Sequence, residues 1–329
     1  MVKSDICPIC GTQETNSIHS NTFSPKPIHL LTRKDLPEDI SSRDERLWIF
    51  FNHISKSKKP VRMEMRQCNT CGFIFTNPRL SSDDVQTKYH ILDQLEKDKL
   101  RHQNNPATKT SKRGKRVYKL FQDQVSEKNW KKPLKILDYG GAEGHLLIPF
   151  LEHGHQAYLI DFLQYPVSDD QIHYLGKDYQ AIPESKRFDF IMLLHTLEHV
   201  VDPVHLVMTM KSFLKPEGLL YVEVPLGAWM EWKFLKEPIT HLNFFSEQSL
   251  GKVFEKAGLQ ITLAQSQWQW VTHGKSPCIN LVGKLSDAQQ NVELEKTNKQ
   301  KRTLYYFQQP MKENPRYYSK LILKRLLQL

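Results

Sequence analysis

A glycine-rich stretch is the first feature of the sequence that could hold a ligand. An apolar run ends at Leu137 and is followed by Asp138, Gly140, Gly141 and Gly144, after which a second apolar run covers residues 146–151. A strand, a glycine turn and a helix N-terminus together bring backbone N–H groups within reach of a polar or anionic ligand. In such a unit an acidic residue after the next strand can hold a ribose, and Asp161 follows the apolar residues 157–160. The pattern predicts a nucleotide-like cofactor, and the alternative is a tight turn in an α/β protein without one.

Two cysteine pairs have the spacing of metal ligands. Each pair is a Cys-x-x-Cys motif followed by glycine, and the four residues are Cys7, Cys10, Cys68 and Cys71. Four thiolates close a tetrahedral zinc site without an open position for water, so we expect a structural zinc. Disulfides are the alternative. They are disfavoured because the N-terminus lacks the apolar core of a signal peptide, and thiols inside the cell stay reduced. The fifth cysteine, Cys278, lies in an apolar strand pattern and is expected in the core.

A group of histidines and acids follows the glycine stretch, and several of them could move a proton. Residues 195–199 contain the H-x-x-E-H pattern of inverted zinc proteases, but that motif needs both histidines on one helix face, and His195 ends an expected buried strand. A histidine can accept a proton from an acceptor carbon or hydroxyl. We predict His241 as the general base, with His199 as second choice and Glu237 as an orienting acid. The alternative for His241 is a hydrogen bond to a backbone carbonyl.

Alternating strands and helices must position these residues. The expected strands are 135–138, 156–160, 188–194 and 218–224, with helices between them, which predicts an α/β fold with a parallel sheet covered on both faces. Residues 259–264 and 278–284 are two further expected strands, joined by a loop that holds Trp268 and Trp270. Because no helix separates these two strands, they should form an antiparallel closing pair.

The same patterns divide the chain into four regions. Residues 1–80 form a zinc-binding domain with an insertion, 81–133 a helical and basic linker that is solvated over 96–116, 134–285 the α/β domain, and 286–329 a basic tail. The tail is amphipathic at its end. It could dock on its own domain or a partner subunit, or lie on an anionic membrane surface.

Charge and composition narrow the function classes. The chain has 329 residues, 39% of them hydrophobic, and a formal net charge of +10. Residues 296–329 hold nine lysines and arginines against Glu313, so eight of the ten net positive charges lie there and the rest is close to neutral. Nucleic acid is therefore not the expected partner. No apolar run reaches about 18 residues, and a cytoplasmic protein is expected. The sequence leaves the oligomeric state open.

Taken together, these motifs resemble class I S-adenosylmethionine-dependent methyltransferases. The resemblance rests on Asp138-x-Gly140-x-Ala142-x-Gly144, Asp161, residues 188–191 leading into 194–203, and the turn at 215–218. The cysteine pairs ahead of Asn77-Pro78 look like those of the zinc-containing sugar C-methyltransferases. Residues 240–246 resemble their Glu-His-x-x-x-Phe-(Ser/Thr) segment, with Thr240 in place of the glutamate. The resemblance implies a Rossmann-like methyltransferase sheet with an antiparallel closing hairpin, plus a small zinc-ribbon-like domain.

The resemblance also implies roles for individual residues. Asp138, Gly140, Gly141 and Gly144 would face the methionine end of S-adenosyl-L-methionine, Asp161 the ribose hydroxyls, and His195 would lie beside the cofactor. Asp178 stands where the family holds the adenine amino group, although a surface turn is the alternative. Related ubiquinone-pathway O-methyltransferases have an acid at the position of His195 and hold a divalent cation there. Imidazole is a poor ligand for magnesium, so we do not expect that cation.

The function implied is methyl transfer to a small or carrier-linked acceptor. A nucleotide-activated sugar, methylated on carbon or oxygen, is the best guess. The zinc domain would supply one wall of the acceptor pocket, with a contribution from Tyr89. The alternatives are an RNA methyltransferase and a non-catalytic protein that binds S-adenosylmethionine or serves as a scaffold.

Overall fold

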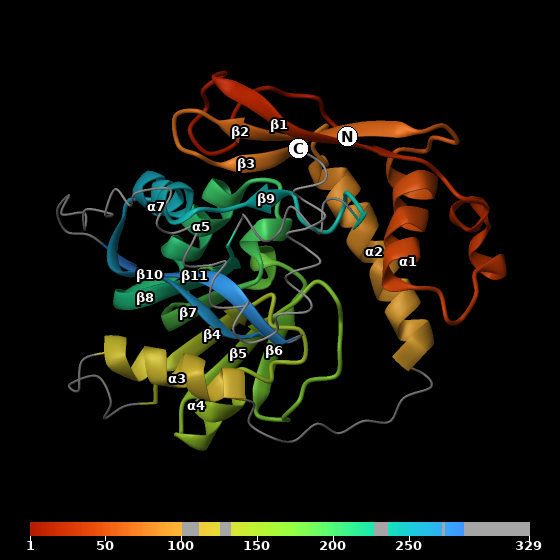
Figure 1. Ribbon diagram of the computed structural model, residues 1–329. Coiled ribbons are helices and arrows are strands. Elements are labelled where there is room, and N and C mark those ends of the chain that lie inside the picture. Colours follow the sequence, from red (N-terminus) through yellow and green to blue (C-terminus); the bar gives the residue numbers. More distant parts are fainter. Residues whose placement is uncertain (101–111, 126–132, 227–235, 272–273, 286–329) are drawn as a thin grey trace. The chain divides into compact units, whose positions relative to one another are not determined.

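The structure is a computed structural model that describes residues 1–100, 112–125, 133–226, 236–271 and 274–285 (Figure 1). All of these belong to one compact unit, residues 1–292. The basic tail lies outside the described residues, so its predicted role stays a prediction.

A seven-stranded sheet forms the larger part of the described chain. Its strands follow the order β10-β11-β8-β7-β4-β5-β6. Their bounds are β4 Lys135–Tyr139, β5 Gln156–Ile160, β6 Ile172–Gly176, β7 Phe188–Leu194, β8 Leu214–Pro225, β10 Leu259–Val271 and β11 Gly274–Leu285. The five neighbouring strands β6, β5, β4, β7 and β8 are parallel, whereas β11 pairs antiparallel with both β8 and β10. The carboxyl ends of the parallel strands therefore meet at one edge of the sheet.

Helices cover both faces of this sheet (Figure 1). Helices α3 (Lys112–Gln124) and α4 (Ile148–Glu152) contact each other, and α5 (Pro203–Ser212) contacts α7 (Glu247–Lys256). Phe121 of α3 and Phe150 of α4 pack with Phe190 of the sheet in a fully buried core. Helix α5 begins where Asp202 accepts a hydrogen bond from the His205 N–H, with proline in its first turn.

The N-terminal region forms most of a second, four-stranded antiparallel sheet. We call this sheet and the helices of the N-terminal region the N-terminal module. Its order is β1-β2-β3-β9. Its elements are β1 Thr15–Phe23, β2 Val61–Cys68, β3 Ile74–Asn77, the helices α1 Ser42–Ile49 and α2 Ser82–Leu100, and the short turns η1 Pro27–Leu30, η2 Arg33–Asp35 and η3 Phe50–Ile54. The edge strand β9 (Asn243–Phe244) comes from the segment that follows His241. The small sheet is therefore completed by the part of the chain expected to carry the catalytic base.

Most sequence-based expectations for the large sheet are confirmed. All four predicted strands form, as does the antiparallel closing hairpin. Strand β6 was not predicted, because this edge strand has a single buried residue, Ile172, and no apolar run. The domain boundaries stay predictions.

Two expectations are wrong. Trp268 and Trp270 lie in β10 and not in a loop, because this strand pairs with β11 along its full length. The basic stretch 96–116 is not a solvated linker throughout: α2 continues to Leu100 and α3 begins at Lys112. Arg113 and Arg116 of α3 point inward, where a buried glutamate binds them.

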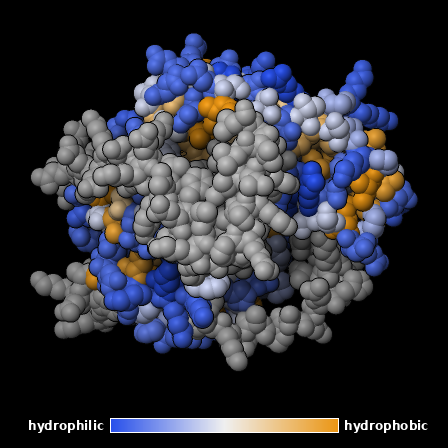
Figure 2. Space-filling model, viewed as in Figure 1, coloured by the Kyte–Doolittle hydropathy of each residue, from blue (hydrophilic) through white to orange (hydrophobic). Residues whose placement is uncertain are grey.

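The surface in view is mostly polar. On the face drawn in Figure 2, most of the coloured residues are hydrophilic, and the hydrophobic ones form small separate groups. Within the described residues, no helix combines the length and the apolar character needed to span a bilayer.

Candidate functional site

The glycine turn after β4 has a backbone that requires small residues. Gly140 and Gly144 have φ angles of +81° and +79°, a region that side chains rarely allow. A Cβ on Gly141 would lie 2.4 Å from the Asp138 carboxylate, and one on Gly140 would lie 2.7 Å from the Thr196 hydroxyl. The side chains of Asp138 and Thr196 therefore leave no room for a side chain at Gly141 or Gly140. Only backbone atoms fit at these two positions of the turn.

Asp138, at the end of β4, is a buried acid without a hydrogen-bond partner. Asp138 is only 1% exposed, and neither of its carboxylate oxygens makes a hydrogen bond. Burial raises the pKa of this carboxyl to about 7, against the opposing effect of the Arg113 charge. Since native proteins pair nearly all buried polar groups, a carboxyl in this state indicates a site that a cationic or hydrogen-donating ligand completes.

Asp161 ties the glycine turn to the end of the neighbouring strand β5. Its carboxylate accepts hydrogen bonds from the N–H groups of Ala142 (2.7 Å) and Leu163 (2.8 Å). Burial raises its pKa in spite of these two bonds. Each carboxylate oxygen can accept a second hydrogen bond, so Asp161 can still bind a diol.

Asp178 follows β6, at the same edge of the sheet. Its carboxylate accepts from the Gln180 N–H (2.9 Å) and begins the short turn η5, Tyr179–Ala181. Burial raises the pKa of Tyr139, and the charge of Asp178 raises it further, which puts this acid near the end of β4. The carboxyl ends of three adjacent strands thus carry Asp138, Asp161 and Asp178, the edge where open parallel sheets bind ligands.

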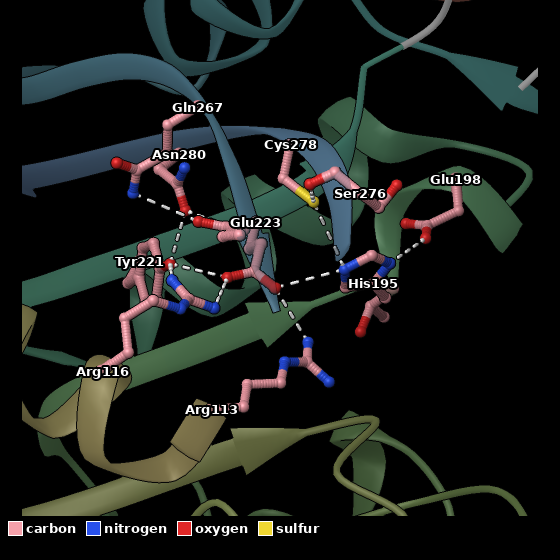
Figure 3. A network of polar contacts seen from close by, with 12 residues as sticks. Arg113, Arg116, His195, Glu198, Tyr221, Glu223, Gln267, Ser276, Cys278 and Asn280 are labelled. Carbon is pink, nitrogen blue, oxygen red and sulfur yellow. Dashed lines mark hydrogen bonds and ion pairs between the residues drawn. The ribbon is translucent and has the colours of Figure 1, made fainter. Parts of the chain in front are cut away.

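His195, just after β7, lies between two buried glutamates (Figure 3). Its Nδ1 is 3.3 Å from Glu198 and its Nε2 is 3.2 Å from Glu223. Burial alone would lower the pKa of His195, but its contacts with the Cys278 thiol and the two glutamates raise it well above the ordinary value. Both ring nitrogens thus face carboxylates, an arrangement that favours the doubly protonated ring.

Glu223 of β8 is the centre of this network and was missed by the sequence analysis. It is fully buried and pairs with Arg113 (2.9 Å) and Arg116 (2.5 Å) of α3, while the Tyr221 hydroxyl donates to it at 2.9 Å. Burial by itself would raise the pKa of Glu223, but His195 and the two arginines lower it below its ordinary range. Cys278 is buried, as expected of a core residue, but its sulfur also lies 3.9 Å from His195 Nε2. The one sequence signal for the buried role of Glu223 was its position as a single acid within the apolar strand expected at 218–224.

Replacing Glu223 by glutamine should destabilise the protein strongly. Two arginines and an imidazolium would keep their charges without the buried carboxylate, a loss that costs about 3 kcal/mol or more in comparable pairs. Because the folded-state pKa of Glu223 is depressed, its contribution is present at neutral pH and is lost as the pH falls below about 4.3, the ordinary glutamate value. Because the loss continues down toward the folded-state pKa, thermal unfolding at pH 7 and pH 3 should show a large deficit at pH 7 that is clearly smaller at pH 3. An equal deficit at both values would contradict the ion-pair assignment.

A second cluster lies on the other side of Glu198 and contains both predicted bases. The His199 and His241 rings meet edge to face with centroids 4.7 Å apart, and His241 is 5% exposed. His199 Nδ1 lies 2.6 Å from the Thr240 carbonyl oxygen, and its Nε2 lies 3.7 Å from Glu198. A carbonyl can only accept, so Nδ1 carries the hydrogen and the neutral ring keeps its lone pair on Nε2. Ligand atoms of the three side chains lie within 4.8 Å of one another, so the cluster could accept a proton or hold a cation.

Glu237 shapes the turn that leads to His241. Its carboxylate accepts hydrogen bonds from the N–H groups of Ile239 (2.9 Å) and Thr240 (3.1 Å). This acid therefore orders the backbone ahead of the predicted base.

The four N-terminal cysteines converge as their spacing predicted. The sulfur atoms of Cys7 and Cys71 are 3.6 Å apart and those of Cys10 and Cys68 are 3.4 Å apart, with all four within 4.8 Å of one another. All five cysteines of the chain are free thiols, so the disulfide alternative is not realised. A tetrahedral zinc with Zn–S bonds of about 2.3 Å places its sulfurs about 3.8 Å apart. The donor set and its geometry fit such an ion.

Helix α2 of the N-terminal module forms a wall beside the acids. The Tyr89 ring packs on Phe162 with centroids 5.3 Å apart, directly after Asp161. Burial raises the pKa of Tyr89, and the charges of Asp161 and Glu198 raise it further. This side chain therefore lies near both the ribose-binding candidate and the histidine cluster.

Comparisons with known proteins find similarity over the part of the chain that forms most of the larger sheet. A family described as "Methyltransferase domain" matches residues 110–264. The ubiquinone biosynthesis O-methyltransferase of Bartonella tribocorum is 30% identical over 143 residues, which cover 40% of this chain and 58% of that protein. The tRNA 5-carboxymethoxyuridine methyltransferase of Escherichia coli is 32% identical over 112 residues, or 30% of this chain and 42% of that protein.

One solved structure similar to this chain is the 1,6-didemethyltoxoflavin-N1-methyltransferase of Burkholderia thailandensis. It is 12% identical with a TM-score of 0.46, covering 67% of this chain and 98% of that one. This chain spans about half the length of the curated relatives it matches. The strand order of the larger sheet and the family match over residues 110–264, just under half of the chain, show a Rossmann-like fold of the class I methyltransferase type.

Proposed function

We propose that this chain is an S-adenosylmethionine-dependent methyltransferase with a structural zinc in its N-terminal module. The observation that carries the proposal is the unpartnered, buried Asp138 carboxyl beneath the glycine turn, next to Asp161. An amino group satisfies the first acid, and a ribose diol satisfies the second. An S-adenosyl nucleoside offers both groups.

The acids at the sheet edge would hold and orient the cofactor. When bound, S-adenosyl-L-methionine supplies a methyl group on a positively charged sulfur. Asp138 would take the amino group of its methionine end, Asp161 the ribose hydroxyls and Asp178 the adenine amino group. The turn at Gly140, Gly141 and Gly144 would let the backbone approach closely. Water has to be excluded from this edge when the ligands are bound, because this favours transfer of the methyl group to the acceptor over hydrolysis.

The histidine cluster would take the proton of the acceptor. His195 is a poor proton acceptor, because both of its ring nitrogens face buried glutamates, which favours the protonated ring. The neutral tautomer of His199 keeps the lone pair on Nε2 and its ring meets that of His241. We propose His241 as the base, with His199 and Glu198 beside it to share the charge. Glu237 acts indirectly by ordering the turn before His241.

The proposed acceptor is a small or carrier-linked molecule, with a nucleotide-activated sugar as the specific hypothesis. The cysteine module and the segment 240–246 support it, since both resemble sugar C-methyltransferases. The relatives described as O-methyltransferases favour oxygen as the methylated atom over carbon. The N-terminal module would supply one wall of the acceptor pocket.

Incubation of the purified protein with methyl-labelled S-adenosylmethionine tests the proposal. Separate reactions would contain nucleotide sugars, catechols and other small phenols, or bulk RNA. The sugar hypothesis predicts label in the nucleotide-sugar pool, lost in His241→Gln. Label in the phenols would keep the methyltransferase proposal and replace the acceptor, and no label in any pool would contradict both.

RNA is a second candidate acceptor because one relative is a tRNA methyltransferase. A binding measurement separates it from the first. If RNA is the substrate, its affinity should fall by orders of magnitude between 50 and 200 mM salt, as expected for about six or more phosphate contacts. A salt-independent, weak association would exclude this candidate.

Tyr89→Ala should weaken cofactor binding. Removal of the ring would uncover Phe162 and open the wall beside Asp161 to water. We expect the Kd for S-adenosylhomocysteine to rise about tenfold, which corresponds to roughly 1.4 kcal/mol of lost contact energy. Calorimetry would measure it, with Tyr158→Ala as control, since this ring packs on Phe188 and His173 away from the acids. An unchanged Kd in Tyr89→Ala would remove α2 from the cofactor site.

A further inference from the structure

We propose that Arg79 of the N-terminal module is a positioning residue that sets the distance between His199 and His241. The inference rests on the proposed function in one respect, that these two histidines form the proton-accepting pair. Arg79 follows β3 and carries no carboxylate partner among its hydrogen bonds. It reaches instead into the methyltransferase domain.

The Arg79 guanidinium bridges the two chain segments that leave the histidines. One nitrogen donates to the Leu242 carbonyl at 3.1 Å, directly after His241. The other donates to the Val201 carbonyl at 2.7 Å and the Val200 carbonyl at 3.3 Å, directly after His199. That nitrogen also lies 2.5 Å from the Asn243 side-chain oxygen. A single planar group thus holds both segments at once.

Other hydrogen bonds from the N-terminal module hold the segment that carries His241: the Thr76 N–H also donates to the Leu242 carbonyl at 3.2 Å, and β3 pairs with β9. Asn243 donates to the carbonyls of Leu197 (2.6 Å) and Val200 (2.8 Å), and the Leu242 N–H donates to the Glu198 carbonyl at 2.8 Å. These bonds run between the segments themselves. Arg79 is 9% exposed, and burial lowers its pKa to about 10, still far above neutral, so it is a permanent buried cation. A charge in such a place needs a closely fitted set of acceptors, and the two segments provide it.

The position of Arg79 also connects the histidine pair to the cysteine cluster. The second cysteine pair, strand β3 and Arg79 are consecutive in the chain, and Arg79 exchanges two backbone hydrogen bonds of 2.7 Å with Val2, near the first pair. Strand β3 in turn pairs with β9, which contains Asn243. The N-terminal module therefore acts on the catalytic domain by holding the segment that carries the base.

The test uses the full-length protein labelled with ¹⁵N-histidine and needs no substrate. In the wild type the His199 Nδ1–H donates to the Thr240 carbonyl, so its signal should be protected from exchange with water, and His199→Gln assigns it. Arg79→Met should strongly weaken or abolish this protected signal, because the guanidinium that ties the Leu242 carbonyl to the Val200 and Val201 carbonyls is lost. Arg79→Lys keeps the charge but not the planar fork, so its signal should be weakened less than that of Arg79→Met.

Arg66→Met is the matched control. Arg66 is another partly buried arginine of the same module, and it donates to the Thr15 hydroxyl and carbonyl at 3.0 and 2.8 Å, away from the histidines. It should leave the His199 signal unchanged. A wild-type His199 signal in Arg79→Met would overturn the proposal, and if that variant does not fold, the same signal in Arg79→Lys decides.

Activity provides a second readout once an acceptor is labelled. Arg79→Met should lower kcat by about 100-fold, the cost of a misplacement near 1 Å, with the Kd for S-adenosylhomocysteine within about twofold of wild type. A wild-type protein that binds no cofactor would refute the proposed function, yet the histidine signal would still decide the role of Arg79.

Discussion

The Asp138→Asn variant is expected to lose cofactor binding and yet to unfold at a higher temperature than the wild type at pH 8. The folded protein raises the pKa of Asp138 from 3.8 to about 7 through burial. The folded state therefore binds more protons than the unfolded state between these values, and stability falls as the pH rises through this window. Above pH 7 the buried charge costs at most about 4 kcal/mol.

Asparagine removes this charge at the price of a buried amide. An unsatisfied amide costs about 1–3 kcal/mol, so we expect a net gain of about 2 kcal/mol at pH 8 and a net loss at pH 4. Without ligand, thermal unfolding at the two pH values should show this reversal of sign. With S-adenosylhomocysteine, the wild type should gain stability and the variant should not, since the amide cannot form the ion pair with the cofactor amino group.

Asp189→Asn is the control for this variant. Asp189 lies near the start of β7, at the edge of the sheet opposite to Asp138. Its carboxylate accepts a hydrogen bond from the Lys135 N–H (2.8 Å) and pairs with Lys215 (2.7 Å). Its replacement should lower stability without changing cofactor affinity. If Asp138→Asn binds the cofactor as the wild type does, the acid has no part in the site.

Metal removal is expected to unfold the N-terminal module. Zinc sites of this type contribute about 10–16 kcal/mol in isolated zinc-finger peptides near neutral pH. Without the ion, four thiols converge in a module whose own sheet has three strands plus the borrowed β9. Purified protein should contain one zinc per chain, and a chelator or the Cys7→Ser/Cys71→Ser variant should expose the amides of β1, β2 and β3 to hydrogen exchange.

The exchange measurement also separates the two parts of the chain. Strands β4, β5 and β7 should keep their protection, because their core does not include the cysteines. Cys278→Ser should retain the zinc, as this thiol lies beside His195 and does not belong to the four-cysteine cluster. Protein without bound metal whose small sheet is as protected as that of wild type would show that the four thiols are merely core.

The parts of the site that the sequence predicted are those encoded by neighbouring residues. Asp138, the glycine turn and Asp161 are joined by one strand–turn–helix unit and the strand that follows it, so period and spacing are enough to find them. The cysteine cluster was found because two identical motifs imply a shared ion. The cofactor-binding candidates and the cysteine cluster can both be predicted because they depend on short sequence motifs with characteristic spacing.

The parts that were missed depend on contacts between distant segments. Glu223 meets Arg113 and Arg116 across more than 100 positions, and Arg79 meets Leu242 across 163. The basic residues of α3 looked solvated because a cation is normally exposed, and the buried acid that holds them lies in an apolar strand. Likewise, no local signal marks Asn243–Phe244 as the fourth strand of another sheet.

A crystal structure of the protein with S-adenosylhomocysteine would test the central claim most directly. The account predicts that the amino group of the ligand lies within hydrogen-bond distance of Asp138 and that its ribose hydroxyls lie on Asp161. A nucleoside bound elsewhere, or a glycine turn that stays closed by protein side chains at saturating ligand, would contradict it.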